Sequence, residues 1–574
     1  MEGIALSLFK RYPVLKKVYL NYINFGYNSK NRLPWKRLCS SRDWYKLTNG
    51  VFEKKKKVLM ATCAGSLITA LDMETILSVA LSLRAAEVHA LICDRFLPAC
   101  LMCQSNKSIG IGRFAKNGPS RIYCKRCFES GIDAYQSAGI KIHLFSDYIT
   151  PEDMSEVEMR VDKTPCERIK NYIYQDLAVG EHAMAGALRF FAKGSIDDEQ
   201  YAQPVLKRYF TASLLTAIVL QKMQKEQKFD TAVFHHGIYV PHGIVGEVFR
   251  KEGVKVVNWN VGYRKGTFIF SHNDTYHHTM MNEPVSKWES ISWNSELEQK
   301  VLSYIKNRSK GTRDWHVFLN EPSGDIATLG IDSFKPAIGL LTNVFWDAQL
   351  HYPANVFKNM LQWILKTIDY FTNRTDLQLI IRVHPAEVTA ELPSRQLVVA
   401  EIKKTFPTLP PNIFVVAPQS KMNTYTLMEA CNAVIIYGTK TGVELTSFGI
   451  PVIVAGEAWI RNKGITVDPE TQKGYFDVLD GLPFGGRMNA EFIQRARKYA
   501  FHFFFRRMVP VEVIEPTDSA YAFRLNVNHL ADLMPGKNIG LDVICNGILA
   551  GKDFIYEDEN FNTQKIKTAA MRHN

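Results

Sequence analysis

The chain has 574 residues, of which 46% are hydrophobic and 22% are charged, a balance typical of a globular protein. No apolar run approaches the ~20 residues of a membrane-spanning helix. The apolar run at residues 4–9 is followed by basic residues, whereas a secretory signal has them in front. The composition therefore favours a cytoplasmic protein of more than one domain, at roughly 100–200 residues each.

The net charge of +13 is concentrated at the start of the chain. Residues 1–57 hold fourteen Lys or Arg and three Asp or Glu, together with Trp35 and Trp44. Cationic and aromatic side chains suit an anionic membrane surface, so this segment predicts a peripheral position at the inner face of the membrane. A solvated basic segment packed on the next domain is the open alternative. No nucleic-acid motif accompanies the charge, and no nucleic-acid partner is expected.

Residues 58–330 alternate between strand-like and helix-like patterns. The expected strands are 58–62, 88–93, 140–145, 231–234 and 254–258, and the expected helices are 72–83, 128–138, 165–192, 203–225 and 243–251. A more polar stretch with one helix, 295–307, follows. Alternation of this kind predicts a mainly parallel sheet.

Residues 331–510 repeat the alternation. The expected strands are 337–341, 377–383, 413–416, 433–437 and 451–454, and the expected helices are 356–371, 425–431, 442–448 and 490–505. Residues 511–574 form a C-terminal extension. Two Rossmann-like parallel-sheet domains facing a cleft, with a ligand between them, correspond to the GT-B plan.

Five of the ten cysteines crowd into residues 93–127, which we interpret as a Cys-rich insert in the first domain. The pairs Cys100-x2-Cys103 and Cys124-x2-Cys127 have the spacing of a four-thiolate Zn2+ site. Four protein ligands leave no open position, so the zinc would be structural. Gly110, Gly112 and Gly118 between the two pairs favour an irregular loop. An iron–sulfur cluster on the same ligands, or unliganded thiols, are the alternatives.

The second domain carries two motifs at strand ends. A strand over 379–383 leads into His384-Pro385, and this places His384 at the carboxyl edge of a parallel sheet, where ligands bind. His384 can donate to a phosphate or cap the next helix. Arg382 is either a second phosphate ligand or part of a surface ion pair.

The second motif runs from Gly438 through Thr439, Thr441 and Gly442 to Glu444. It predicts a strand, a tight turn and a helix start, where backbone N–H groups and hydroxyls bind anions. Glu444 could accept from ribose hydroxyls or could serve as a first-turn carboxylate on the helix dipole.

His384-Pro385, Gly438-Thr-Lys-Thr-Gly-Val-Glu444 and Phe448-Gly-Ile-Pro-Val-Ile-Val-Ala-Gly456 together resemble the C-terminal lobe of capsule polysaccharide biosynthesis proteins. More distantly, they resemble bacterial sialyltransferases and sugar-nucleotide 2-epimerases. The resemblance covers about 340–470 and implies that His384 meets the phosphate of a CMP-sugar and that Thr439 and Thr441 form the hydroxyl-bearing turn.

Candidates in the first domain follow strand ends. Ser66 comes after the first strand, and Asp72 is either the general base or a carboxylate at a helix start. The remaining candidates for acceptor binding or catalysis are His235, His236, His242 and Arg264. Solvated loop positions are the alternative for Arg264.

We therefore predict a GT-B glycosyltransferase that moves sugar from a nucleotide-sugar donor, CMP- or UDP-linked, to a surface-polysaccharide or glycolipid acceptor. His384, Asp72 and His236 are the catalytic candidates. The alternatives are an enzyme related to sugar-nucleotide epimerases, which needs no acceptor, and a non-catalytic scaffold of envelope assembly.

Overall fold

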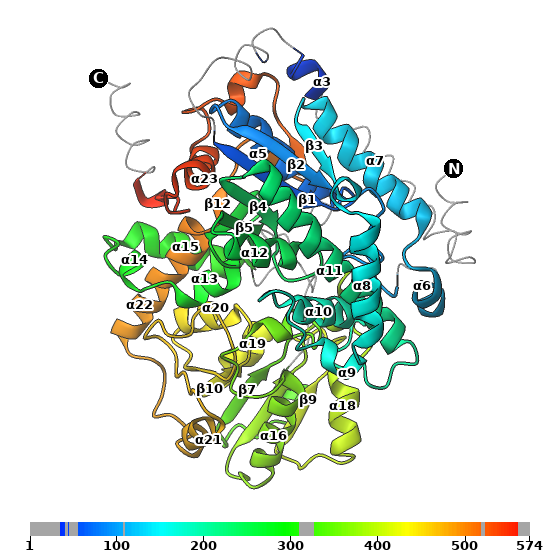
Figure 1. The fold of residues 1–574 in the computed structure, drawn as a ribbon. Helices are drawn as coiled ribbons and strands as arrows, with labels where there is room; N and C mark the ends of the chain where they lie inside the picture. The colour runs from blue at the N-terminus through cyan, green and yellow to red at the C-terminus, as the bar shows by residue number, and fades with distance from the viewer. Residues whose placement is uncertain are drawn as a thin grey trace, which may run out of the picture.

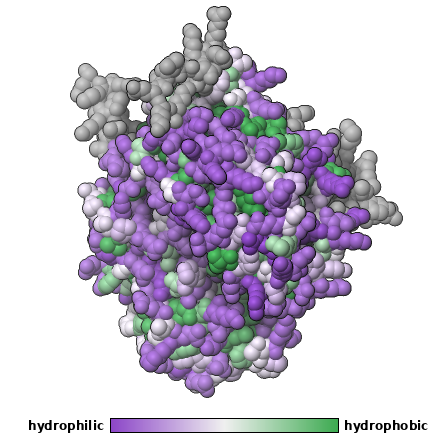
Figure 2. All heavy atoms as spheres, in the orientation of Figure 1, coloured by the Kyte–Doolittle hydropathy of each residue, from purple (hydrophilic) through white to green (hydrophobic). Residues whose placement is uncertain are grey.

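The computed structural model describes residues 35–40, 44, 56–106, 110–308, 326–517 and 523–560. They form two α/β lobes, each built on a mainly parallel sheet, and Figure 1 shows the first lobe above the second. No helix among these residues combines the length and the apolar character needed to cross a bilayer. The face in Figure 2 is mostly hydrophilic, with apolar side chains scattered over it.

The sheet of the first lobe has seven strands in the order β12-β6-β5-β4-β1-β2-β3. The strands are β1 (Lys57–Cys63), β2 (Glu87–Ile92), β3 (Lys141–Leu144), β4 (Thr231–His235), β5 (Lys255–Val261), β6 (Thr267–His272) and β12 (Val509–Pro510). Strands β1 to β5 run parallel, whereas β6 and β12 are antiparallel to their neighbours. Buried apolar residues follow one another along β1 and β4 because helices cover both faces.

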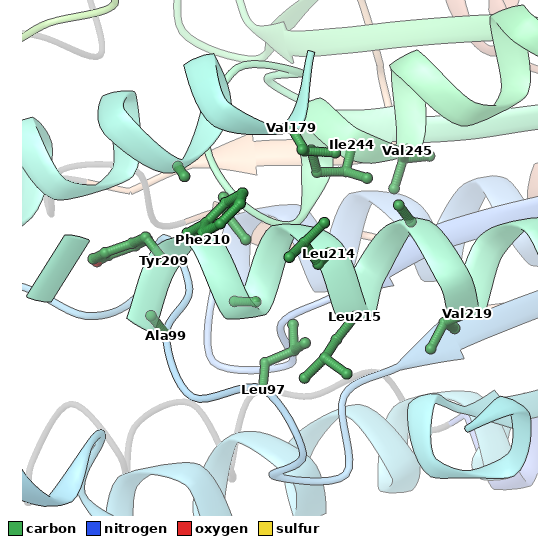
Figure 3. Close-up of a cluster of buried hydrophobic side chains, with 14 of the residues drawn as sticks. Leu97, Ala99, Val179, Tyr209, Phe210, Leu214, Leu215, Val219, Ile244 and Val245 are labelled. Carbon is green, nitrogen blue, oxygen red and sulfur yellow. The ribbon is translucent and has the colours of Figure 1, made fainter. Parts of the chain in front are cut away.

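Several helices of this lobe are longer than expected. They are α5 (Ile68–Ser82), α6 (Ile111–Asn117), α7 (Arg121–Ser137), α8 (Pro151–Lys163), α9 (Cys166–Ile169), α10 (Val179–Phe191), α11 (Ala202–Gln227), α12 (His242–Lys251), α13 (Tyr276–Asn282), α14 (Ser286–Glu289), α15 (Ser295–Arg308) and α23 (Ile539–Ala550). The single helix expected over 165–192 is divided into α9 and α10, and α8 and β6 were not predicted. Figure 3 shows Leu97 and Ala99, from the start of the insert, packed against α11.

The sheet of the second lobe is entirely parallel, in the order β11-β10-β7-β8-β9. Its strands are β7 (Ala337–Leu341), β8 (Gln378–Arg382), β9 (Ile413–Val416), β10 (Ala433–Ile436) and β11 (Val452–Val454). Its helices include α16 (Met360–Thr372), α17 (Ala386–Thr389), α18 (Val398–Thr405), α19 (Thr424–Glu429), α20 (Thr441–Ser447), α21 (Gln472–Asp480) and α22 (Ala490–Phe501), which continues as a π-helical turn, His502–Arg506.

The chain returns to the first lobe after α22. Strand β12 joins β6, and α23 packs on β12 and α5. The two lobes also meet through backbone contacts, such as Arg395 N–H to the carbonyl of Ala192 at 3.0 Å. The carboxyl edges of the two sheets face each other, because Tyr239, beyond β4, reaches Asp347, beyond β7.

Two segments differ from expectation in their local structure. The insert was expected to be an irregular loop, but its middle forms α6 between Gly110 and Gly118, and Cys124 and Cys127 lie on α7. From residues 1–57, the helical turn α3 (Trp35–Leu38) and Trp44 are described, and both tryptophans are buried in the core beside α5. At these positions the segment packs on the domain, whereas most of the predicted membrane-binding segment lies outside the described residues.

Candidate functional site

His384 stands at the carboxyl edge of the second sheet, directly after β8 and half-buried. Its backbone N–H donates to Thr342 Oγ1 at 3.1 Å, and its Nδ1 accepts from the N–H of Ala386 at 3.0 Å. Because Nδ1 is an acceptor, the proton of the neutral imidazole sits on Nε2. His384 therefore caps the following turn with Nδ1, which is one of its two expected roles, and Nε2 carries the proton that the other role would use.

The Thr439–Thr441 turn lies at the same edge of the sheet as His384. It follows β10, and β7 separates β10 from β8, so at ~4.8 Å between strands the two elements are about 10 Å apart. The hydroxyls of Thr439 and Thr441 lie 3.1 Å from each other, and the N–H of Thr441 donates to Thr439 Oγ1 at 3.3 Å. The end of β7, followed by Thr342, lies between the two motifs.

A charged cluster lies beneath this turn. Glu444 is fully buried, and its carboxylate pairs with Arg308 at 3.2 Å and with Lys440 at 3.3 Å, while the hydroxyl of Tyr425 donates to it. Burial raises the pKa of Glu444, but the two cations outweigh burial and hold the pKa below its usual value. Two cations and one carboxylate leave a net positive charge beside the turn.

Two predicted nucleotide ligands have structural roles. Arg308, Lys440 and Tyr425 bind the carboxylate of Glu444, which lies in the first turn of α20, as the alternative to ribose binding expected. Arg382 is 1% exposed and donates to the carbonyls of Ala417, at 2.6 Å, and Ser420, at 3.1 Å, so it holds the segment after β9. The expected surface ion pair of Arg382 is therefore wrong, and its role as a phosphate ligand stays a prediction. Gly438 and Gly442 lie in the turn and in α20, where Gly442 packs on Ile436.

The three histidines of the first lobe lie together at the end of β4. The His235 ring is 5.8 Å from the ring of His236 and 6.1 Å from the ring of His242, between centroids. His235 Nε2 is 3.0 Å from Asn260 Oδ1, and His242 Nε2 is 3.0 Å from the carbonyl of Thr62. Burial lowers the pKa of His235 to about 3 and that of His242 to about 4, and it lowers the pKa of His236 well below its usual value. All three are neutral at pH 7.

His236 has a backbone conformation that favours a functional role. Its φ of +62° lies in the left-handed region, which side chains other than Gly, Asn and Asp seldom adopt. The imidazole lies near Tyr239 and Tyr276, with ring centroids 5.1 and 6.2 Å away.

Asp347 is a site residue that the sequence reasoning missed. It follows β7 in the second lobe, and its Oδ1 accepts from the hydroxyl of Tyr239 at 3.0 Å. The guanidinium of Arg189 lies 5.1 Å from the centre of the Tyr239 ring. The Asp347 side chain is exposed to solvent, but desolvation by the surrounding protein raises its pKa. The hydrogen bond from Tyr239 and the charge of Arg189 lower the pKa and offset part of this effect. A carboxylate of raised pKa therefore lies between the lobes, beside the neutral histidines.

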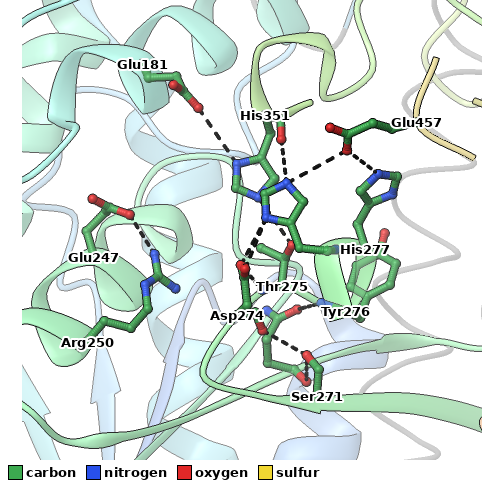
Figure 4. A network of polar contacts seen from close by, with 12 residues as sticks. Glu181, Glu247, Arg250, Ser271, Asp274, Thr275, Tyr276, His277, His351 and Glu457 are labelled. Carbon is green, nitrogen blue, oxygen red and sulfur yellow. Dashed lines mark hydrogen bonds and ion pairs between the residues drawn. The ribbon is translucent and has the colours of Figure 1, made fainter. Parts of the chain in front are cut away.

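A second interlobe network contains Asp274, His351 and Glu457 (Figure 4). His278 joins these three residues. His278 Nδ1 lies 3.2 Å from both oxygens of Asp274, and Nε2 is 2.7 Å from the carbonyl of His351 in the other lobe. Burial opposes protonation of His278, but Asp274 and Glu457 overcome burial and raise its pKa. Protonated His278 thus ties the second-lobe segment at His351 to the first lobe.

The side chains of Asp274, His278 and His351 are close enough to be considered as metal ligands. The rings of His278 and His351 are stacked, however, with centroids 4.2 Å apart and planes 13° apart. A metal ion lies in the plane of each imidazole that binds it, and two stacked rings do not share such a point. Asp274, His278 and His351 therefore form a hydrogen-bonded contact between the lobes, which we call the interlobe clip.

The other first-lobe candidates are more dispersed. Ser66 is half-buried, and its N–H donates to Cys127 Sγ at 3.3 Å. Asp72 is half-buried in α5, one turn after the helix begins. Arg264 donates to the carbonyl of Met508 at 3.3 Å and stacks on Phe505. It therefore binds the segment between α22 and β12 and does not lie in a solvated loop.

The four predicted zinc ligands come into one neighbourhood. The N–H of Cys103 donates to the carbonyl of Cys100 at 2.9 Å, in a turn, and Cys124 and Cys127 are one helical turn apart on α7. Burial raises the pKa of Cys124, and the Cys100 and Cys127 thiols raise it further because they are near. Among the described residues, no three cysteine sulfurs all lie within 4.8 Å of one another.

Comparisons with known proteins bear on the second lobe. Residues 324–476 match the family model described as capsule polysaccharide biosynthesis protein, which confirms for this segment the family recognised from the motifs. No curated protein matches the chain.

Solved structures that are similar to the chain include KpsC β-Kdo transferases from Thermosulfurimonas dismutans. The 2,4 transferase is 10% identical, with 48% of this chain and 80% of that chain covered and a TM-score of 0.33. The 2,7 transferase is 13% identical, with 54% and 86% covered and a TM-score of 0.30. The spinosyn rhamnosyltransferase SpnG is 12% identical, with 78% and 95% covered and a TM-score of 0.24.

Proposed function

We propose that this chain is a GT-B-type glycosyltransferase that moves a sugar from a nucleotide-sugar donor to a surface-polysaccharide or glycolipid acceptor. The observation that carries the proposal is the position of His384 and the Thr439–Thr441 turn at one edge of a parallel sheet, opposite the first-lobe histidines. The match of residues 324–476 to the capsule polysaccharide biosynthesis family supports the same chemistry.

The donor, a CMP- or UDP-sugar, would bind to the second lobe. The Nε2–H of His384 donates to a phosphate oxygen, and the hydroxyls of Thr439 and Thr441 contribute further donors. The net positive charge of Arg308, Lys440 and Glu444 suits the phosphate. When the bond between the sugar and the phosphate breaks, these groups stabilise the charge that develops on the leaving nucleotide.

The acceptor would lie between the lobes. Asp347 is our candidate for the base that takes the proton of the acceptor hydroxyl, because its pKa is raised and the Tyr239 hydroxyl holds it in place. His236 remains a candidate for the same role, since a neutral imidazole can accept a proton. Asp72, at its place in α5, remains a third candidate.

We also propose a structural Zn2+ on Cys100, Cys103, Cys124 and Cys127. The bond from Ser66 N–H to Cys127 Sγ is of the kind that stabilises a metal-bound thiolate. The ion would join the Cys100–Cys103 turn to α7. Metal analysis of purified protein should find about one zinc per chain. The Cys100→Ser/Cys124→Ser variant should lose it, whereas Cys545→Ser, a buried cysteine elsewhere, should keep it.

A transfer assay with labelled nucleotide sugars tests the main proposal. Label should pass to the acceptor only when both donor and acceptor are present. Conversion of the donor without an acceptor would instead identify an epimerase. A chain that binds no nucleotide at all would be a scaffold.

A further inference from the structure

The first turn of α7 is more exposed than the rest of the helix. The buried residues of this 17-residue helix, Gly131, Ala134 and Tyr135, all lie in its second half. In the first half, Ile122 is 66% exposed and Tyr123 is 48% exposed. Most other large apolar side chains at the described surface are exposed singly, whereas these two are neighbours.

The surface around them is basic. Residues 105–128 contain no Asp or Glu. Four exposed cations surround Ile122 and Tyr123 in sequence: Arg113, Lys116, Arg121 and Lys125. We call the exposed parts of α6 and of the first half of α7 the α6–α7 surface, and Figure 1 shows both helices at the right-hand edge of the first lobe.

The α6–α7 surface is held rigidly. Phe114 of α6 is buried and stacks on Phe190, with ring centroids 4.4 Å apart. Arg208 donates to the carbonyls of Ala115, at 3.0 Å, and Lys116, at 2.7 Å, and so closes the end of α6. The exposed side chains therefore project from a fixed base.

We propose that the α6–α7 surface docks on an anionic lipid bilayer. Cations concentrate at an anionic membrane surface, and an exposed isoleucine and tyrosine gain by entering the interface between headgroups and acyl chains. Nucleic acid and free polysaccharide offer the anionic charge but no apolar layer for Ile122. The inference does not depend on sugar transfer, although it agrees with a glycolipid acceptor.

Docking of the α6–α7 surface would bring the bilayer close to the candidate site. Cys127 in α7 accepts from the N–H of Ser66, and a Cβ atom on Gly65 would stand 2.3 Å from the Cys127 carbonyl. The α6–α7 surface thus adjoins the loop at the carboxyl end of β1, on the edge that faces the second lobe. A bilayer held there would present its lipid headgroups beside the first-lobe edge of the site.

Flotation with vesicles tests the proposal on the full-length chain. Vesicles of phosphatidylcholine with about one third phosphatidylglycerol should bind the protein, and neutral vesicles or high salt should release it. Arg121→Ser/Lys125→Ser should weaken binding by about 30-fold. Ile122→Ser/Tyr123→Ser should weaken it by about tenfold, without removing any charge.

Matched variants keep the test specific. Lys403→Ser/Lys404→Ser removes two exposed lysines from α18, and Phe334→Ser removes an exposed apolar ring, so both should bind vesicles like the wild type. Urea unfolding like that of the wild type shows that all variants are folded, and this control does not depend on the proposed function. Wild-type affinity in both α6–α7 variants, or binding to an oligonucleotide but not to vesicles, would overturn the proposal.

Discussion

The two facing sheet edges differ in how they handle charge. At the second-lobe edge, two cations and a carboxylate pair beneath the Thr439–Thr441 turn and leave a net positive charge. At the first-lobe edge, burial keeps three histidines neutral. The difference indicates which side receives which substrate, because a phosphate needs positive charge, whereas the hydroxyls of an acceptor bind to neutral hydrogen-bonding groups.

The largest expected effect concerns Asp347, which lies between the two edges. Asp347→Asn should lower kcat by about 10²–10⁴-fold, the usual contribution of a general base. Donor binding should change little. Asp477→Asn, at an exposed position in α21, is the matched control and should transfer sugar normally. Full activity of Asp347→Asn would leave His236 and Asp72 as the bases to test.

The pH dependence of the unfolding free energy can show whether the interior of the first lobe excludes charge, because Glu74 is buried there. Burial raises the pKa of this carboxyl from 4.5 to about 7, although Trp259 Nε1–H donates to it at 2.9 Å. Because the pKa of the folded state is the higher one, the unfolding free energy should fall as pH rises from 4.5 to 7. The expected loss is on the order of 3 kcal/mol.

Urea unfolding at pH 5 and pH 8 measures this loss. Glu74→Gln cannot ionise and should show a much smaller decrease than the wild type. Glu252→Gln, at an exposed position, should keep the wild-type decrease. Equal decreases in the wild type and Glu74→Gln would show that Glu74 is not the group that titrates.

A substitution at Gly65 tests how tightly the loop after β1 packs against α7. A Cβ atom at Gly65 would lie 2.3 Å from the Cys127 carbonyl and 2.5 Å from the Gly131 nitrogen, so backbone must move. Gly65→Ala should lower the unfolding free energy by about 1–3 kcal/mol. Gly474→Ala, whose Cβ would have its nearest neighbour at 3.4 Å, should be neutral or stabilising. A neutral Gly65→Ala would mean that the loop and α7 are less tightly packed.

The smallest effect is expected at His278, the charged histidine of the interlobe clip. Its pKa is raised, so its stabilisation is present below about pH 6.5 and is lost as pH rises through the folded-state value. His278→Gln should cost under about 1 kcal/mol at pH 5.5 and less at pH 8.5.

The neighbouring His277 provides the control for this measurement. Burial lowers its pKa to about 4, so His277→Gln should have the same effect on the unfolding free energy at both pH values. A cost at His278 that does not vary with pH would show that the clip holds without protonation.

The strands of the second lobe could be predicted from the sequence because they are short apolar runs that end at Gly, Pro or polar residues. Strand β9 agrees with the expected range, 413–416, and β7 with 337–341. The roles of Arg382 and Glu444 could not be predicted in this way. Arg308, which neutralises Glu444, comes from a distant helix, and no local pattern shows that a strand arginine will bond to carbonyls beyond β9.

Asp347 and the insert show two other limits. Asp347 belongs to no motif, and its importance comes from Tyr239, which only the packing of the lobes brings to it. In the insert, the glycines predicted a loop, but Phe114 is buried against Phe190 and supports α6. Tertiary contacts thus overrode the local signal in both cases.

Calorimetric titration of CMP- and UDP-sugars into the wild type, His384→Ala and His529→Ala tests the central claim most directly. Removal of the Nε2 donor should weaken donor binding by about 10–100-fold, as expected for a hydrogen bond to a charged group. The exposed His529 should be replaceable without effect. Equal affinity in His384→Ala and the wild type would contradict a donor phosphate at the His384 edge of the second sheet.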